Sequence, residues 1–269
     1  MRIQVNGTTL NVLQKSAIGN QQSAILVFLH YFGGSSRAWA GVIDQLADEH
    51  RSVAPDLRGF GNSDAPDAGY ATSEMADDVI ALIASLGLER YVLVGHSMGG
   101  KIALAVAARR PVGLRSLVLL APSPPTPEPV DDSERTRLLK TYGDRLAAAE
   151  TVSKIVAQPL PRQEYEHVIA DNLRTSSTAW RAWLEHGSRE NIAATLASVR
   201  GPVFIAVGGN DDTITAPLVR REITARLQQS TPVRVIGGAG HLLPLEAPSP
   251  IGNFIFECVA DAARTGGLQ

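Results

Sequence analysis

Residues 91–101 read Tyr-Val-Leu-Val-Gly-His-Ser-Met-Gly-Gly-Lys. The apolar residues at the start predict a buried strand, and the residues after the second glycine continue as a helix, so the pattern predicts a strand, a sharp turn and a helix. Ser97 stands at the turn, within G-x-S-x-G. A turn this tight strains the serine backbone, and side chains in place of Gly95 or Gly99 would collide with the neighbouring strand or helix. The stretch predicts an α/β sheet in which Ser97 is a nucleophile.

An acid and a histidine follow Ser97 in the chain. His241 lies in a glycine-rich loop after the apolar run 233–236, and two adjacent aspartates, Asp211 and Asp212, follow the apolar run 203–207. A serine hydroxyl needs a base whose pKa lies near 7, and the base needs a carboxylate that fixes its tautomer. The order serine, acid, histidine is the one expected after this kind of turn, so we expect His241 to be the base.

The chain resembles the α/β-hydrolase fold family over nearly its whole length. The resemblance rests on four motifs, which are 30–34 (His-Tyr-Phe-Gly-Gly), 56–63 (Asp-Leu-Arg-Gly-Phe-Gly-Asn-Ser), 95–99 and 238–248. It implies a mostly parallel, eight-stranded α/β sheet with helices on both faces. It also implies an oxyanion hole made by the backbone N–H groups of Phe32 and Met98.

Two positions need a choice within this resemblance. Counting from the preceding strand as G-x-x-D favours Asp211 as the acid, whereas the family's apolar residue two positions after the acid matches Ile214 and favours Asp212. We prefer Asp212 and leave Asp211 as the alternative. Tyr31 replaces the family's second glycine. Its side chain is expected either to narrow the substrate pocket or to pack beneath the cap described next.

A proline cluster at 121–129 interrupts the alternation of strands and helices. The following residues have helical patterns at 135–142, 146–156, 163–173 and 178–185. We therefore expect residues 1–121 and 199–269 to form the hydrolase core and residues 122–198 to form a helical cap, or lid, over the cleft. Trp180 and Trp183 are three residues apart, on one helix face, and are expected to line the cleft or to pack the cap onto the core.

Other segments predict the remaining elements. Residues 3–10 read as a hairpin around Asn6-Gly7, and further strands are expected at 24–29, near Val53, and at 114–120. Helices are expected at 36–48 and 72–86, the second ending at Gly87. Ligands in such sheets bind at the carboxyl ends of the strands, where Ser97 and His241 fall.

Composition limits the possible functions. The 269 residues have a formal net charge of −2 and no basic stripe, so we expect no nucleic-acid partner. A single cysteine, Cys258, excludes an internal disulfide and is expected to be a buried small hydrophobe. No apolar run is long enough for a membrane span, and the first residues form no signal-peptide core, so a cytoplasmic protein is expected. No metal or cofactor is implied, and the oligomeric state is left open.

Three features suggest competing interpretations. Residues 95–101 also match most of a phosphate-binding P-loop, but Ile102 stands where a magnesium-binding Ser or Thr belongs. His96 adjoins Ser97 and is expected to be a buried hydrogen-bonding residue whose side chain points away from the serine. Asp56 is expected to have a structural role in a turn.

These observations predict a serine hydrolase that cleaves a carboxylic ester or related small acyl compound. The resemblance also allows lactone or carbon-carbon bond hydrolysis, or cofactor-free haloperoxidase or perhydrolase activity, on the same residues. A hypothesis of a different class is a ligand receptor that retains the triad with little turnover.

Overall fold

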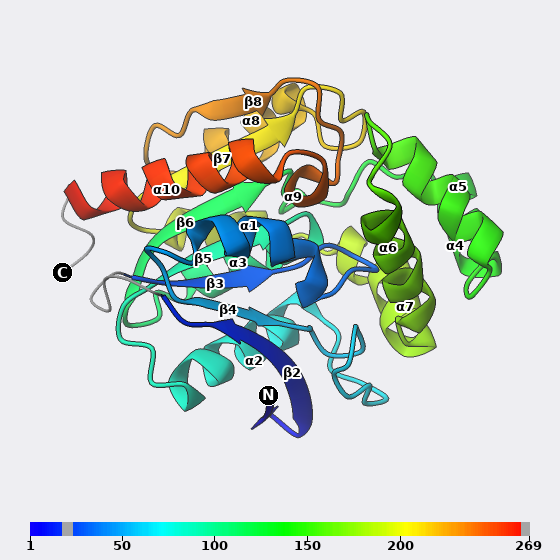
Figure 1. Cartoon of the computed structure of the whole chain (residues 1–269), viewed down its shortest axis with the longest axis horizontal. Coiled ribbons are helices and arrows are strands. Elements are labelled where there is room, and N and C mark those ends of the chain that lie inside the picture. The colour runs from blue at the N-terminus through cyan, green and yellow to red at the C-terminus, as the bar shows by residue number, and fades with distance from the viewer. Residues whose placement is uncertain (18–23, 265–269) are drawn as a thin grey trace.

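An eight-stranded sheet forms the centre of the molecule, as seen in the computed structural model of residues 1–17 and 24–264 (Figure 1). The strand order is β1-β2-β4-β3-β5-β6-β7-β8. The β1–β2 and β2–β4 pairs are antiparallel, and all other neighbouring strands are parallel. The strands are β1 (Arg2–Val5), β2 (Thr8–Lys15), β3 (Ile25–Leu29), β4 (Ser52–Pro55), β5 (Tyr91–His96), β6 (Leu114–Leu120), β7 (Val203–Gly208) and β8 (Val233–Ile236).

Helices cover both faces of the sheet. On one face α1 (Ala40–Leu46) packs against α10 (Pro248–Arg264), and on the other α2 (Thr72–Ser85) packs against α3 (Met98–Ala108) (Figure 1). Because both faces are covered, the central strands are mostly apolar, and every residue of β5 is buried. The shorter elements of the core are η1 (Ser36–Trp39), α8 (Ala216–Glu222), η4 (Thr224–Arg226) and α9 (Leu243–Glu246).

The predicted fold class is confirmed, with differences at the element ends. The hairpin turns at Asn6-Gly7, where both residues have positive φ, and Val5 pairs with Thr8. The second hairpin strand continues to Lys15, beyond the predicted end, because it also pairs with β4. The helix predicted at 36–48 is a 3-10 turn followed by α1, and α8 was not predicted.

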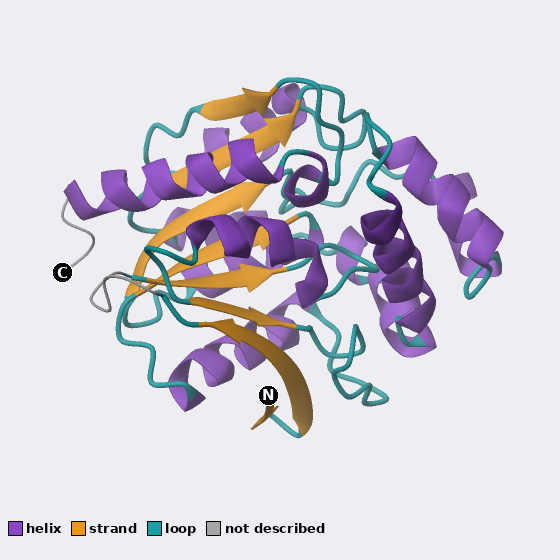
Figure 2. Cartoon of the chain, viewed as in Figure 1, coloured by secondary structure: helices purple, strands orange, loops and turns teal. Residues whose placement is uncertain are grey.

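Four helices lie between β6 and β7, within residues 122–198, which we call the helical insertion (Figure 2). Its helices are α4 (Asp132–Lys140), α5 (Arg145–Ile155), α6 (Arg162–Arg174) and α7 (Ser177–Glu185), followed by the 3-10 turns η2 (Gly187–Arg189) and η3 (Ala193–Ser198). Several sets of contacts join it to the core, two of which lie beside Tyr31 and Ser35. Val152 and Val168 pack with Tyr31 in a small apolar cluster, and the buried Asp171 accepts hydrogen bonds from Ser35 Oγ at 2.6 Å and from Arg37.

The approach of α3 to the sheet explains two of the elbow glycines. A Cβ atom at Gly95 would lie 2.5 Å from the carbonyl oxygen of Gly99, and one at Gly99 would lie 2.4 Å from the carbonyl oxygen of Leu29. Both contacts are with backbone, which cannot rotate away. Only hydrogen fits at these two positions.

We therefore expect Gly99→Ala to lower the free energy of unfolding by about 1–3 kcal/mol or more, because the methyl group overpacks the junction of α3 and β3. Gly237→Ala is the matched control, since no atom lies within 4 Å of a Cβ built there. Urea denaturation of the three proteins measures the difference. Equal midpoints for the two variants would contradict the close approach.

Candidate active site

Ser97 lies between the last residue of β5 and the first residue of α3. Its φ of 52° and ψ of −118° are unusual for a residue with a side chain. Hydrogen bonds fix this conformation, because Ser97 N–H donates to the Leu120 carbonyl at 3.0 Å and the Ser97 carbonyl accepts from Ser123 N–H at 3.0 Å. The strained turn directs the serine hydroxyl away from the sheet.

A continuous hydrogen-bonded chain joins Ser97, His241 and an aspartate. His241 Nε2 lies 2.9 Å from Ser97 Oγ, and His241 Nδ1 lies 2.7 Å from Asp211 Oδ2. Asp211 Oδ1 in turn accepts from the backbone N–H groups of Thr213 and Ile214, at 2.8 and 2.9 Å. The carboxylate thus holds a proton on Nδ1 and leaves Nε2 free to accept the serine proton.

The preference for Asp212 as the partner of His241 is wrong. Asp211 is buried and bonded to His241, whereas Asp212 is exposed. The physical reason is local: the Asp211 side chain turns back to accept two N–H groups of the following loop, which aims its second oxygen at the imidazole. Asp212 then follows on the outer side of the turn.

The two partners shift each other's pKa. Burial, the largest single effect, lowers the pKa of His241, but the charge and hydrogen bond of Asp211, together with Glu128 and Glu246, outweigh it and the net pKa is raised. Burial alone would raise the pKa of Asp211, but the charge and hydrogen bond of His241 and the two backbone donors hold it below its usual value. The arrangement therefore stabilises an imidazolium next to a carboxylate.

His96 has a different role from His241. Its Nε2–H donates to the His241 carbonyl oxygen at 2.8 Å, and this bond helps to hold the loop that contains His241. Burial, with the nearby His241, lowers the pKa of His96 to about 3. His96 therefore stays neutral, as expected for a buried hydrogen-bonding residue.

A cavity of about 200 Å³ opens onto Ser97 and His241. Phe32, Trp180 and Trp183 form an aromatic part of its wall, with the Phe32 ring centroid 4.6 Å from that of Trp180 and 6.2 Å from that of Trp183. Tyr31 also lines it, while packing beneath the helical insertion and folding its ring over Gly34. The two alternatives for Tyr31 are thus not exclusive.

The two residues predicted to form the oxyanion hole lie near Ser97. Phe32 lines the cavity, and Met98 is the first residue of α3, directly after Ser97. His30 holds the preceding loop, because its Nε2 accepts from Leu57 N–H at 2.9 Å and its Nδ1–H donates to the Tyr31 carbonyl at 2.8 Å. Those two bonds fix one neutral tautomer of His30.

Glu246 positions the histidine loop and was not singled out from the sequence. Its carboxylate accepts from Gly240 N–H and Leu242 N–H, both at 2.9 Å, on either side of His241. It also accepts from Ala157 N–H of the helical insertion at 2.7 Å. Glu246 belongs to the motif at 238–248, which was the sequence signal for this role.

Two further motifs have structural roles. Asp56 accepts hydrogen bonds from Ser36 N–H at 2.7 Å and Asn62 N–H at 2.8 Å, as expected for a turn residue. Lys101 is buried, and its Nζ donates to the Glu190 carbonyl at 2.7 Å. A buried lysine that donates to a backbone carbonyl does not fit the P-loop interpretation.

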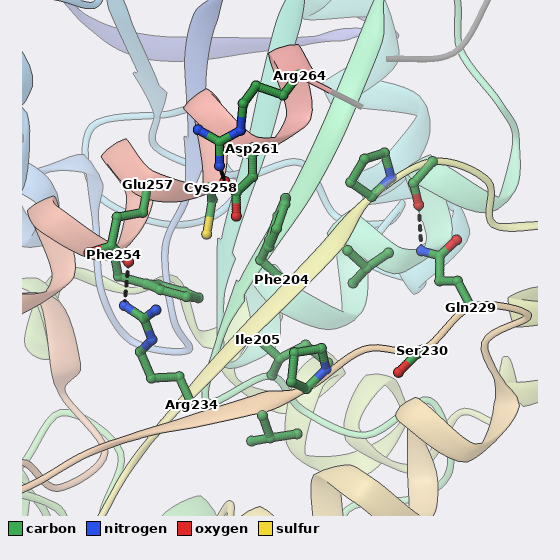
Figure 3. Close-up of a pocket in the computed structure, with 15 residues that line it drawn as sticks. Phe204, Ile205, Gln229, Ser230, Arg234, Phe254, Glu257, Cys258, Asp261 and Arg264 are labelled. Atoms are coloured by element: carbon green, nitrogen blue, oxygen red, sulfur yellow. Dashed lines mark hydrogen bonds and ion pairs between the residues drawn. The ribbon is translucent and has the colours of Figure 1, made fainter. Parts of the chain in front are cut away.

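A larger cavity, of about 920 Å³, lies at the N-terminal ends of β7 and β8, beside α10 and away from Ser97 (Figure 3). Its charged side chains pair with one another: Arg234 with Glu257 at 2.7 Å, and Arg264 with Asp261. Cys258 is buried there, as predicted. Size does not make this cavity the active site, because no serine-histidine pair faces it.

Two further kinds of feature are absent from residues 1–17 and 24–264. No cluster of three His, Cys, Asp or Glu side chains within these ranges is placed to hold a metal ion. None of the helices described there combines the length and apolar character that a bilayer-spanning helix requires.

The model of the family described as "Alpha/beta hydrolase family" matches residues 26–251. The chain belongs to this family. It is 28% identical over 274 residues to a 2-(acetamidomethylene)succinate hydrolase of Mesorhizobium japonicum, covering 94% of each chain. It is 30% identical to a 2-hydroxymuconate semialdehyde hydrolase of a Pseudomonas species, covering 88% of each.

The family's fold extends to solved structures of lower identity. An esterase from Exiguobacterium antarcticum superposes with a TM-score of 0.86 at 22% identity, covering 96% of this α/β hydrolase and 98% of the esterase. With the named hydrolase relatives, family membership makes this chain an α/β-fold hydrolase.

The two adjacent aspartates offer a test within the α/β hydrolase. We expect Asp211→Asn to lower kcat/KM for 4-nitrophenyl acetate by about four orders of magnitude, because His241 loses its tautomer and its countercharge. Asp212→Asn is the matched control and should stay within about twofold, as an exposed substitution does.

The pH profile adds a second readout. Activity should rise with pH as His241 loses its proton, and Asp211→Asn should move that inflection to lower pH because the carboxylate raises the pKa of His241. An unmoved inflection in Asp211→Asn, or equal mild losses in both variants, would place the acid elsewhere.

Proposed function

We propose that this α/β hydrolase is a serine hydrolase that cleaves a carboxylic ester or a related small acyl compound. The observation that carries the proposal is His241, which bridges Ser97 Oγ and the buried Asp211 carboxylate at the wall of a cavity. Nucleophile, base and orienting acid meet at hydrogen-bond distances where a small molecule can enter. The helical insertion, acting as a cap, encloses the cavity with Trp180 and Trp183.

The reaction proceeds in two balanced halves. Ser97 Oγ attacks the substrate carbonyl carbon while its proton passes to His241 Nε2, and the oxyanion is held by the N–H groups of Phe32 and Met98. The intermediate collapses to an acyl-enzyme, and His241 gives its proton to the departing alcohol. Water then attacks the acyl carbon, its proton passes to His241, and Ser97 leaves as the alcohol when the acid is released.

The names of the two relatives do not narrow the class of acyl compound that the proposal allows. The name of one denotes an acetamido compound and that of the other a semialdehyde without an ester group. The same serine, histidine and oxyanion donors serve attack on either kind of carbonyl. A receptor with vestigial turnover is disfavoured because the whole hydrogen-bonded chain is intact.

Replacement of the nucleophile tests the proposal. Ser97→Ala should fold normally and lose about a million-fold in kcat for 4-nitrophenyl acetate, as removal of a triad serine does elsewhere. A fluorophosphonate probe should label Ser97 in the wild type and nothing in the variant. Ser153→Ala, an exposed serine on α5, is the matched control. Substantial hydrolysis by Ser97→Ala would refute the mechanism.

Tyr31 gives a prediction about acyl specificity. Its ring occupies space beside the cavity, so Tyr31→Gly should raise the kcat/KM ratio of octanoate to acetate 4-nitrophenyl esters by about tenfold or more. Tyr31→Phe keeps the ring and should keep the ratio. If both variants retain the wild-type chain-length profile, the helical insertion sets acyl length instead.

A further inference from the structure

The cavity wall contains a buried guanidinium. Arg135 lies on α4 with 4% of its surface exposed, and it lines the cavity that also contains Ser97 and His241. Its Nη1 donates to the carbonyl oxygen of Leu184 at 2.6 Å and to Ser188 Oγ. Those bonds hold one side of the guanidinium at the end of α7, and the group has further N–H donors.

Comparison with Arg58 shows what Arg135 lacks. Arg58 is buried to a similar degree, and its Nε and Nη2 donate to the two carboxylate oxygens of Asp78. Within the described part of the chain, Arg135 makes no such ion pair. A buried charge without a partner is strongly unfavourable, so a guanidinium kept unpaired in a substrate cavity calls for an anion from outside the chain.

The acidic side chains near Arg135 do not fill that role. Glu134 pairs with Arg137 at 2.6 Å, and the exposed Asp132 pairs with Arg189. Glu128 lines the same cavity, but among the described residues it forms no ion pair with Arg135, and burial raises the pKa of its carboxyl.

We infer that the substrate of this α/β hydrolase carries a carboxylate, which binds Arg135 while the reacting carbonyl lies at Ser97. The inference rests on the proposed function and narrows it to acyl compounds that are also anions. Between the two polar ends lies the aromatic wall of Phe32, Trp180 and Trp183, which suits a short apolar spacer. The cavity of about 200 Å³ is below the range of roughly 300–1,000 Å³ typical of drug-sized ligands, so the substrate is compact.

Matched ester pairs test the inference. Each mono-4-nitrophenyl ester of glutaric to suberic acid is compared with the mixed diester in which the free carboxylate is methylated. The two compounds differ only in that carboxylate. The wild type should prefer the acid at one spacer length by about 100-fold in kcat/KM, and Arg135→Gln should abolish that preference, because the buried ion-pair partner of the carboxylate is lost. Arg135→Lys should retain part of it, and Arg181→Gln, which removes an exposed cation from α7, should retain all of it.

A binding experiment covers a variant that fails to fold. Adipate should inhibit the wild type competitively and bind Ser97→Ala protein in calorimetry, whereas the uncharged adipamide should do neither. Ser97-dependent hydrolysis of the methyl diesters with no preference for the acids, and no binding of adipate, would overturn the inference alone. Loss of Ser97 dependence for every ester would overturn the proposed function instead.

Discussion

The arrangement of the site depends on the backbone at Ser97. Its φ of 52° is tolerated because β5 and α3 meet at a point where both flanking glycines are in backbone contact. The end of β6 and the loop after it supply the hydrogen bonds that keep the turn in place, through Leu120 and Ser123. Local strain is thus offset by packing and hydrogen bonds of the sheet, and the serine is held ready before any substrate binds.

Electrostatics give two buried histidines, whose ring centroids lie 5.4 Å apart, opposite pKa shifts and different roles. His96 faces a carbonyl and stays neutral, while His241 faces a carboxylate and has a raised pKa. Burial acts on both in the same direction, so the partner atom decides which ring accepts a proton. The neutral His96 then helps to position His241, because its N–H donates to the His241 carbonyl.

The sequence was most informative where chemistry and backbone geometry are local. The strand, turn and helix around Ser97 could be predicted because G-x-S-x-G lies between clear elements, and the loop of His241 followed from its glycines. Asp211 and Asp212 could not be separated, since adjacent loop residues satisfy similar spacing rules and only the side-chain bonds to Thr213 and Ile214 distinguish them. Arg135 escaped notice because its partner Leu184 is 49 residues away in the chain. Glu246 lies within the motif at 238–248, but its bonds to Gly240 and Leu242 are visible only in the folded chain.

The helical insertion lines the cavity and also fixes parts of the site. The Ile155 carbonyl accepts from His241 N–H at 2.7 Å, and Asp171 accepts from Ser35 Oγ, just after the motif at 30–34. The insertion and the core are therefore coupled through these hydrogen bonds. A chimera that took residues 122–198 from a relative would have to restore the acceptor at Ile155, the donor at Ala157 and the carboxylate at Asp171. Sequence drift is freest on the helix faces that look away from these anchors.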